Sequence, residues 1–427
     1  MGTPEQIAPP RPGEACLDGE GPSPRVRHLL AVARHAFVMQ GFAATSIDAI
    51  AREGGVSKET VYRHFADKAA LFRAALEDQA QAFVRRTEAV HAAAPTPREE
   101  LAQLARAILD AAIESGLLSP VQAAIEVAQD MPDFASALER RHWQTLEPVR
   151  RALAAQAALH GRAGAVPAEL AIDFGSLAVE GPRLMFGFDA PAAERRGLVA
   201  GAVADLFAAG LATVVAPSLP APSLDAAADL PSHIAHLLDV AAEHFLNDGY
   251  AGASLDRIGA EARVGRGTLY RHFSGKHGLF VAAMRRAAML LAPTPKALRS
   301  PPPISGVGVA DIAGWLLRAL EALGHPRVLR LQRTAIAESR RDPALAREVY
   351  HRLRAPWHEP LALAIAGLRP SGEDALDQAR WLAAQALVLA HRGNRLFLRP
   401  DPLGKTEAAA QANRAAAVLL GGVAAIA

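Results

Sequence analysis

The sequence predicts an all-α protein in which one helical unit occurs twice. The 427 residues are 51% hydrophobic, much of it Ala, and 21% charged, a composition that suits helices packed in water. Apolar residues recur at helical spacing, and no run of β-branched residues typical of a strand interrupts them. A segment that begins at Gly41 recurs without a gap 208 residues later, at Gly249, with 17 identities in 36 positions.

The duplication extends beyond this segment and divides the chain into two halves. Ala124-Ile125 matches Ala335-Ile336, and Glu147-Pro148 matches Glu359-Pro360. We therefore expect each half to hold a small and a large helical domain. The expected order is a disordered leader over 1–24, domains over 25–77 and 78–215 (the first half), a Pro-containing linker over 216–231, and domains over 232–285 and 286–427 (the second half).

The first small domain is predicted to begin with an amphipathic helix. Leu29, Leu30, Ala33 and Phe37 share one face of this helix. Gly41 is expected to end it, because glycine weakens a helix.

Three shorter elements are expected after Gly41. Ser46 can cap a short second helix, and Gly54-Gly55 provides the following turn. Ser57 is the predicted N-cap of a third helix that runs to about Phe65, and Asp67 begins a fourth. A helix, a short helix, a Gly-containing turn and a helix form the helix-turn-helix arrangement. The second copy has Gly249, Ser254, Gly265, Phe273 and Phe280 in the same roles.

Bulk properties exclude several protein classes. The net charge is only +2, so any surface for nucleic acid must be local. The single cysteine, Cys16, excludes an intramolecular disulfide and cysteine-based zinc sites, and it favours a cytoplasmic location. Residues 1–24 lack the order of a signal peptide, and we expect no membrane-spanning segment.

The repeated motif resembles a known family. Gly-Phe-x-x-Thr-Ser-Ile-x-x-Ile-Ala, followed by Gly-Val-Ser-Lys-x-Thr-Val-Tyr-Arg-His-Phe-x-x-Lys-x-x-Leu, looks like the N-terminal domain of TetR-family transcriptional regulators. The second copy, Val-Gly-Arg-Gly-Thr-Leu-Tyr-Arg-His-Phe-x-x-Lys, is similar to it at least as closely. The resemblance implies a DNA-binding domain followed by a helical domain for ligand binding and dimerisation, and a function in repression.

The third helix of each copy is expected to lie in the major groove of DNA. Lys58 and its counterpart Arg266 are candidates for guanine contacts, because Arg can bind O6 and N7 together. Glu59 can accept from a cytosine amino group or repel phosphate, whereas its counterpart Gly267 can do neither. The two copies are therefore expected to prefer different half-sites.

Other residues of the motif are expected to position the protein on DNA. Tyr62, His64 and Lys68 would contact the phosphate backbone, which sets register without specifying sequence. The expected DNA-binding set is Ser46, Ser57, Lys58, Glu59, Thr60, Tyr62, Arg63, His64 and Lys68, with Ser254, Gly265, Arg266, Gly267, Thr268, Tyr270, Arg271, His272 and Lys276 in the second copy.

The large domains are expected to bind an unknown small-molecule effector. Pocket candidates are Glu126, Arg140, Arg141, His142, Trp143, Glu180 and Arg183 in the first half, and Glu338, Arg340, Trp357, His358 and Arg392 in the second. Most such residues on Ala-rich helices form solvated faces or salt bridges between helices. No zinc signature, phosphate loop or catalytic carboxylate pair occurs in the sequence, so we expect no cofactor, no metal and no enzyme.

Helix-turn-helix units generally act in pairs, with recognition helices about 34–36 Å apart along the DNA. TetR-like proteins pair two identical chains through their last two helices. The matching segments here lie near 168–187 with 192–215, and near 373–393 with 404–427. The linker of about 15 residues can extend to roughly 50 Å, which allows an intramolecular pseudo-dimer on an asymmetric double-stranded DNA operator.

Several alternatives stay open from the sequence. Activation of transcription stays open beside repression, because the sequence does not separate the two. Two chains can still form a homodimer that presents four helix-turn-helix units. The chain can also be a ligand-binding or scaffold protein in which only one helix-turn-helix unit binds DNA.

Overall fold

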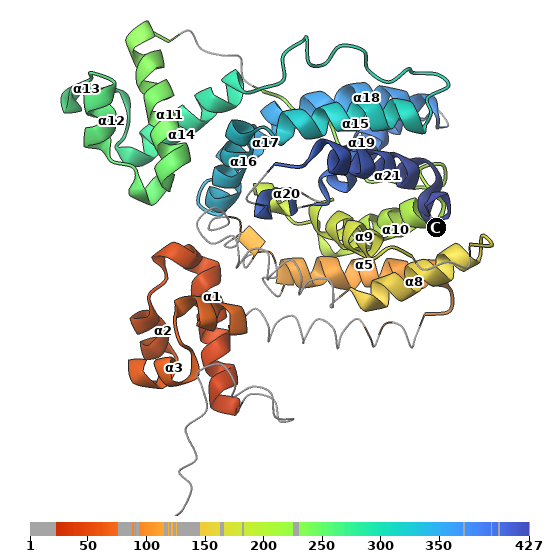
Figure 1. Ribbon diagram of the computed structural model, residues 1–427, viewed down its shortest axis with the longest axis horizontal. Helices are drawn as coiled ribbons and strands as arrows, with labels where there is room; N and C mark the ends of the chain where they lie inside the picture. Colours follow the sequence, from red (N-terminus) through yellow and green to blue (C-terminus); the bar gives the residue numbers. More distant parts are fainter. Residues whose placement is uncertain are drawn as a thin grey trace, which may run out of the picture.

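The structure is a computed structural model that describes residues 23–75, 94–114, 146–162, 166–224 and 230–426, with gaps at 182, 370–371, 394 and 400–401, and a few isolated positions between 88 and 125. Every regular element in these ranges is a helix (Figure 1). The leader, apart from its last two residues, lies outside the described part, as do Glu126 and residues 140–143. Of the helices described, none is long and apolar enough to span a bilayer.

The first helix-turn-helix unit comprises α1 (Pro24–Ala44), α2 (Ile47–Glu53) and α3 (Lys58–His64). The predicted caps are confirmed: the Ser46 side chain accepts a hydrogen bond from the Asp48 N–H, and Ser57 from the Thr60 N–H. The prediction that Gly41 ends the first helix is wrong. That helix continues to Ala44, and Thr45 ends it with extended backbone angles while its hydroxyl donates to the Ala36 carbonyl.

The second helix-turn-helix unit comprises α11 (Ser232–Gly252), α12 (Leu255–Glu261) and α13 (Arg266–His272), followed by α14 (Lys276–Leu290). Here Gly249 does interrupt the first helix, with φ 71° and ψ 171°. Ser254 caps α12 through the Arg257 N–H. Gly265 occupies the N-cap position of α13 without a side-chain hydrogen bond, so this helix begins less firmly than α3.

The larger part of the molecule is a helical body that both halves build. The first half contributes α5 (Pro97–Glu114), α8 (Glu147–Ala158), α9 (Ala168–Glu180), η1 (Leu184–Phe186) and α10 (Ala193–Ala209). The second half contributes α15 (Val309–Leu323), α16 (Pro326–Glu338), α17 (Pro343–Leu353), α18 (Ala355–Gly367), α19 (Ala375–His391), α20 (Arg395–Leu398), α21 (Lys405–Gly421) and η2 (Gly422–Ala425).

Four helices at the centre of the body form a bundle. Helix α9 packs on α10 and on α19, and α21 packs on the same two helices. They fall in the segments that the sequence indicated as matching helices of the two halves. Their contact faces are lined by Ala, Leu and Phe side chains with almost no exposure, among them Phe174, Phe207, Leu387 and Leu419.

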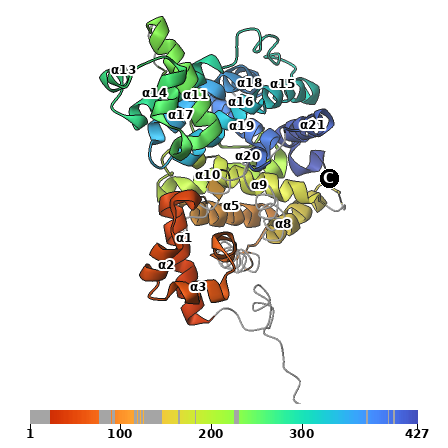
Figure 2. The same ribbon diagram turned by 60° about the vertical axis from the view of Figure 1, so that its left-hand side comes forward.

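The two helix-turn-helix units lie on the same side of this body, at opposite ends of it (Figures 1 and 2). The second unit is fixed to the body because α14 packs on α17 and α11 packs on α16. Arg285 of α14 forms an ion pair with Glu348 of α17 at 2.8 Å, and Arg327 of α16 forms one with Glu243 of α11.

Candidate nucleic-acid interface

Helices α3 and α13 present matching polar surfaces. Val61 of α3 and Leu269 of α13 are buried, and each fixes its helix to its own unit. The side chains on the opposite face of each helix therefore point outward. The exposed members of the expected DNA-binding set are Ser46, Ser57, Lys58, Glu59, Tyr62, Arg63 and His64 in the first copy, and Gly265, Arg266, Gly267, Tyr270, Arg271 and His272 in the second. The half-buried members are Thr60, Lys68, Ser254, Thr268 and Lys276.

Exposed tyrosines distinguish these surfaces from ordinary helix faces. Tyr62 is 45% exposed and Tyr270 62%. A large ring that leaves apolar area in water without a neighbouring element to cover it is a feature of binding surfaces. Each tyrosine lies one turn beyond the candidate base-contacting cation, so both groups face the same direction.

The candidate guanine-binding cations are each held by an aspartate of the preceding helix. Lys58 Nζ lies 2.9 Å from Asp48 Oδ1. Arg266 is held more rigidly, since its Nε and Nη2 donate to the two carboxylate oxygens of Asp256 at 2.6 and 2.5 Å. These hydrogen bonds raise the pKa of Lys58 and of Arg266 and lower that of the Asp256 carboxyl. Both cations therefore stay charged at the surface.

The spacing of these pairs is the same in both copies of the sequence. Asp48 and Asp256 stand ten residues before their cations and are themselves 208 residues apart. An aspartate in the first turn of a short helix suggests a favourable position near the helix N-terminus, so nothing in the one-dimensional pattern singles it out as a partner of the next helix.

Lys68 and Lys276, expected at phosphate, also stabilise the units internally. Lys276 Nζ donates to the Ala251 carbonyl at 3.0 Å and lies 5.1 Å from the centre of the Tyr250 ring. Lys68 Nζ lies 4.8 Å from the centre of the Phe42 ring. The second lysine thus satisfies a carbonyl at the end of α11.

Three of the described pocket candidates gather around Tyr350: Arg183 lies 5.6 Å and the His358 ring 5.8 Å from the centre of its ring, and Glu180 adds to the effect of burial in raising its pKa. Glu180, Trp357 and His358 are buried, whereas Glu338 pairs with Arg341 at 3.5 Å. Burial raises the pKa of Glu180 to about 7, with Arg354 opposing the shift, and burial lowers that of His358 well below its usual value. Arg183 lies over the Phe188 ring, 3.9 Å from its centre, and burial lowers its pKa.

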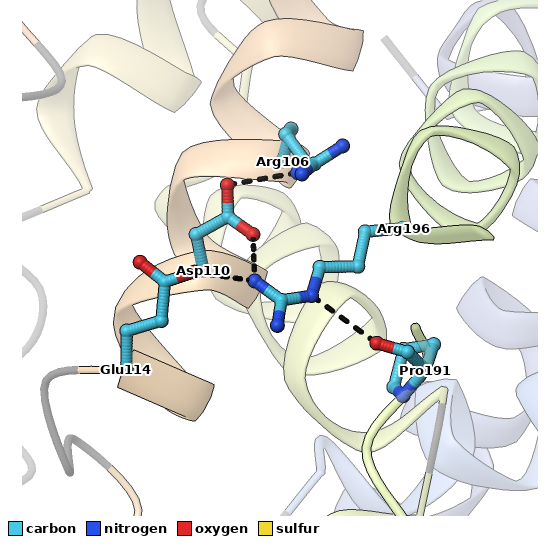
Figure 3. Close-up of polar contacts among 5 residues, drawn as sticks. All are labelled: Arg106, Asp110, Glu114, Pro191 and Arg196. Atoms are coloured by element: carbon cyan, nitrogen blue, oxygen red, sulfur yellow. Dashed lines mark hydrogen bonds and ion pairs between the residues drawn. The ribbon is translucent and has the colours of Figure 1, made fainter. Parts of the chain in front are cut away.

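A cleft of about 580 Å³ lies between α5 and α10 in the first half. Arg106, Asp110 and Glu114 of α5 line it together with Gly197 of α10. Arg196 Nη1 bridges Asp110 Oδ1 at 2.8 Å and Glu114 Oε1 at 2.5 Å, and its Nε donates to the Pro191 carbonyl (Figure 3). The sequence shows the spacing that places Arg106, Asp110 and Glu114 on one helix face. The ion pairs of Arg196 with Asp110 and Glu114, in contrast, depend on how α10 packs on α5.

Comparison with known proteins places this geometry in a family. The model "Bacterial regulatory proteins, tetR family" matches residues 29–75 and again residues 237–283, which span both helix-turn-helix units. The chain belongs to the TetR family. The family consists of regulators rather than enzymes, in agreement with the expectation from the sequence. A second model, "AefR-like transcriptional repressor, C-terminal domain", matches residues 314–421, from α15 to α21.

Individual relatives cover parts of the chain. It is 35% identical over 107 residues, or 25% of its length, to the HTH-type transcriptional repressor SCO4008 of Streptomyces coelicolor, and it spans 50% of that protein. The crystal structure of a TetR-family transcriptional regulator from Mesorhizobium loti is 25% identical, with 42% of this chain and 93% of that chain covered and a TM-score of 0.35.

Proposed function

We propose that this TetR-family protein is a DNA-binding transcriptional repressor that acts in the cytoplasm as a single-chain pseudo-dimer. The observation that carries the proposal is the bundle of α9, α10, α19 and α21, in which the last two helices of one half pack on those of the other. Both helix-turn-helix units lie on the same side of this bundle (Figure 1). Such a pair suits two successive major-groove sites on one face of double-stranded DNA.

The operator in this proposal is asymmetric because the two surfaces differ. The first copy offers Ser57, Lys58 and Glu59 at the start of its helix, and the second offers Gly265, Arg266 and Gly267. Arg266 suits a guanine in its half-site, whereas Glu59 suits a cytosine. Identical half-sites would leave one of these groups without its base.

A small-molecule effector in a large domain would release the DNA. The cleft between α5 and α10 is the proposed binding site of the effector in the first half, because α10 is also a helix of the central bundle. A ligand that binds one arrangement of α10 more tightly than the other shifts the population between the two arrangements. The distance between the two helix-turn-helix units then changes, and affinity for the operator falls.

The test is selection of random duplex DNA by the intact chain. It is done at a low and a high salt concentration, because phosphate contacts dominate affinity and weaken as salt increases. Two matched double variants accompany the wild type: Lys58→Ala with Tyr62→Ala, and Arg266→Ala with Tyr270→Ala. Each changes one exposed surface and leaves the buried Val61 or Leu269 in place.

The proposal predicts two unlike half-sites at one fixed spacing, and the loss of one particular half-site in each double variant. A palindromic site bound by two chains would instead indicate a homodimer. An unchanged site in the Arg266 and Tyr270 variant would mean that only the first unit binds DNA. No enriched sequence at either salt concentration would leave a ligand-binding or scaffold protein.

A further inference from the structure

A buried charged group lies where the two halves meet in the central bundle. Asp173 of α9 is 1% exposed. Its Oδ2 lies 3.2 Å from Nε of Arg414 on α21, and its Oδ1 lies 3.7 Å from Nε of Arg392 at the end of α19. The carboxylate belongs to the first half and both guanidinium groups belong to the second. This contact therefore holds the two halves to each other.

The two faces can be compared position by position. Gly181-Pro182-Arg183-Leu184 matches Gly393-Asn394-Arg395-Leu396, and Gly210 matches Gly422, all at a separation of 212 residues. At the same separation, Asp173 corresponds to Gln385, Glu180 to Arg392 and Ala202 to Arg414. These six residues are called the pairing set. In none of the three positions do the halves carry the same side chain.

Two-fold pairing means that each contact has a mate with the halves exchanged. The mate of Asp173 facing Arg392 is Gln385 facing Glu180. Gln385 does lie there: a Cβ on Gly181 would be 3.2 Å from Gln385 Oε1. A Cβ on Gly393 would be 3.0 Å from Glu180 Oε1, so Glu180 lies against the end of α19. The mate contact thus contains an amide in place of a second aspartate.

We propose that the pairing set makes this interface specific for unlike halves, so that the first half accepts the second half and rejects a copy of itself. The inference rests on the proposed pseudo-dimer and names what selects it. Two first halves would bring Asp173 against Glu180 and Ala202, which places carboxylates together with no cation from the set. Two second halves would bring Gln385 against Arg392 and Arg414, which places guanidinium groups together with no carboxylate.

The penalty for either like pairing is large because Asp173, Glu180, Gln385 and Ala202 are buried and the two arginines are half-buried. An ionised group taken out of water requires a partner of opposite charge, and breaking a buried pair is strongly destabilising. Glu180 already shows the effect of its surroundings, since burial raises its pKa to about 7 even with Arg354 nearby. A second carboxylate beside it would add repulsion. Selection against a wrong partner through unpaired charge is a general source of specificity.

The test exchanges the pairing set within the full chain. In the first variant, Gln385→Asp, Arg392→Glu and Arg414→Ala give both halves the residues of the first half. In the second, Asp173→Gln, Glu180→Arg and Ala202→Arg are added, so that the two halves have exchanged their residues completely. Thermal unfolding and light scattering measure the Tm and the mass without DNA. Asp205→Ala, which removes an ion pair with Arg98 inside the first half, is the control.

The wild type is expected at the 45.0 kDa mass of one chain. The first variant should lose several degrees of Tm and much of the single-chain species, and the complete exchange should restore both. The control should change neither beyond a small loss of Tm. A first variant that keeps its Tm and mass overturns the proposal. So does a complete exchange that fails to restore them, because the residues would then stabilise the bundle without selecting its partner.

These readouts are separate from the proposed function. A chain that selects an asymmetric DNA site but tolerates the first variant would be a pseudo-dimer whose pairing depends on the linker alone. A chain that selects no DNA would contradict the regulator, yet its Tm and mass would still report on the pairing set.

Discussion

Gly210 and Gly422 end the two long helices α10 and α21 at matching positions, and each glycine lies against the backbone of the other helix. The Leu211 N–H donates to the Leu419 carbonyl at 2.8 Å, which joins the two helix ends. Gly210 has φ 75° and Gly422 φ 65°. A Cβ on Gly422 would lie 2.7 Å from the Phe207 carbonyl oxygen, and one on Gly210 would overlap that of Leu420. Both positions therefore need glycine.

Gly210→Ala should destabilise the protein more than a comparable change in open space. Gly249 is the matched control, because it has φ 71° and nothing within 4 Å of a Cβ. Gly249→Ala should lower the free energy of unfolding by about 1–3 kcal/mol through backbone strain alone. Gly210→Ala should lower it by a further ~1–3 kcal/mol, because the added carbon crowds a backbone that cannot move aside. Chemical denaturation measures both, and equal losses would contradict the close approach.

Local features of the fold followed from the sequence, whereas contacts between the halves did not. Ser46 and Ser57 were recognisable as caps because a cap depends only on residues two or three positions away. Gly41 misled because a glycine inside a helix costs only about 1 kcal/mol, which the packing of Phe37 and the bond from Thr45 can offset. The contact between Gly210 and Gly422 depends on how two helices 212 residues apart meet.

The candidate DNA surface shows the same division. The cations Lys58 and Arg266 were predicted from their place at the start of a helix. Their aspartate partners were not, because the angle between consecutive helices decides which side chains of α2 and α12 reach α3 and α13. The cleft of the first half was missed for a related reason: Arg196 meets Asp110 only after α10 has packed on α5.

Asp256→Asn should weaken discrimination at the base pair that Arg266 contacts. The two hydrogen bonds from Nε and Nη2 to the carboxylate fix the orientation of the Arg266 guanidinium group and direct Nη1 away from Asp256. Loss of this restraint should reduce preference for the favoured base by about 1 kcal/mol, roughly fivefold. Removal of a negative charge should at the same time raise affinity for unrelated DNA.

Binding of single-base-pair variants of the selected site measures this effect. Asp48→Asn is the control, since it should change preference only in the other half-site. A sharper preference in Asp256→Asn would show that the aspartate competes with the base instead of orienting the arginine.

Arg263→Gly should stabilise the second helix-turn-helix unit. Arg263 has φ 54°, a left-handed conformation that disfavours side chains, and the matching residue of the first copy is Gly55 with φ 64°. Glycine at this turn removes strain of about 1 kcal/mol, partly offset by the greater freedom of the unfolded chain. Gly55→Ala should have the opposite effect in the first copy. Denaturation curves in which Arg263→Gly is less stable than the wild type would contradict this expectation.

Glu180 should make stability depend on pH in a defined direction. Its pKa rises from 4.5 to about 7 on folding, so the folded state holds the proton more tightly. The associated stability is complete below pH 4.5 and is lost as the pH rises through 7. The loss is on the order of 3 kcal/mol.

Glu180→Gln removes this titration, so the unfolding free energy of the variant relative to the wild type should increase between pH 4.5 and 7. His351 and His358, whose pKa values burial lowers, act in the opposite direction in both proteins, and the difference between the proteins largely removes them. A difference that does not vary with pH would exclude Glu180 as the titrating group.

In the proposed pseudo-dimer, the linker affects how operator occupancy depends on the number of regulator molecules in the cell. The Leu219 N–H donates to the Asp377 carbonyl at 3.1 Å, so the linker contacts the second half at this point. A short covalent connection keeps the halves at an effective concentration in the millimolar range. Association of separate subunits, by contrast, weakens as copies become few. At low copy number, the occupancy of the operator would therefore rise in proportion to the number of regulator molecules. A few copies of the regulator would already repress the target gene in that proportion.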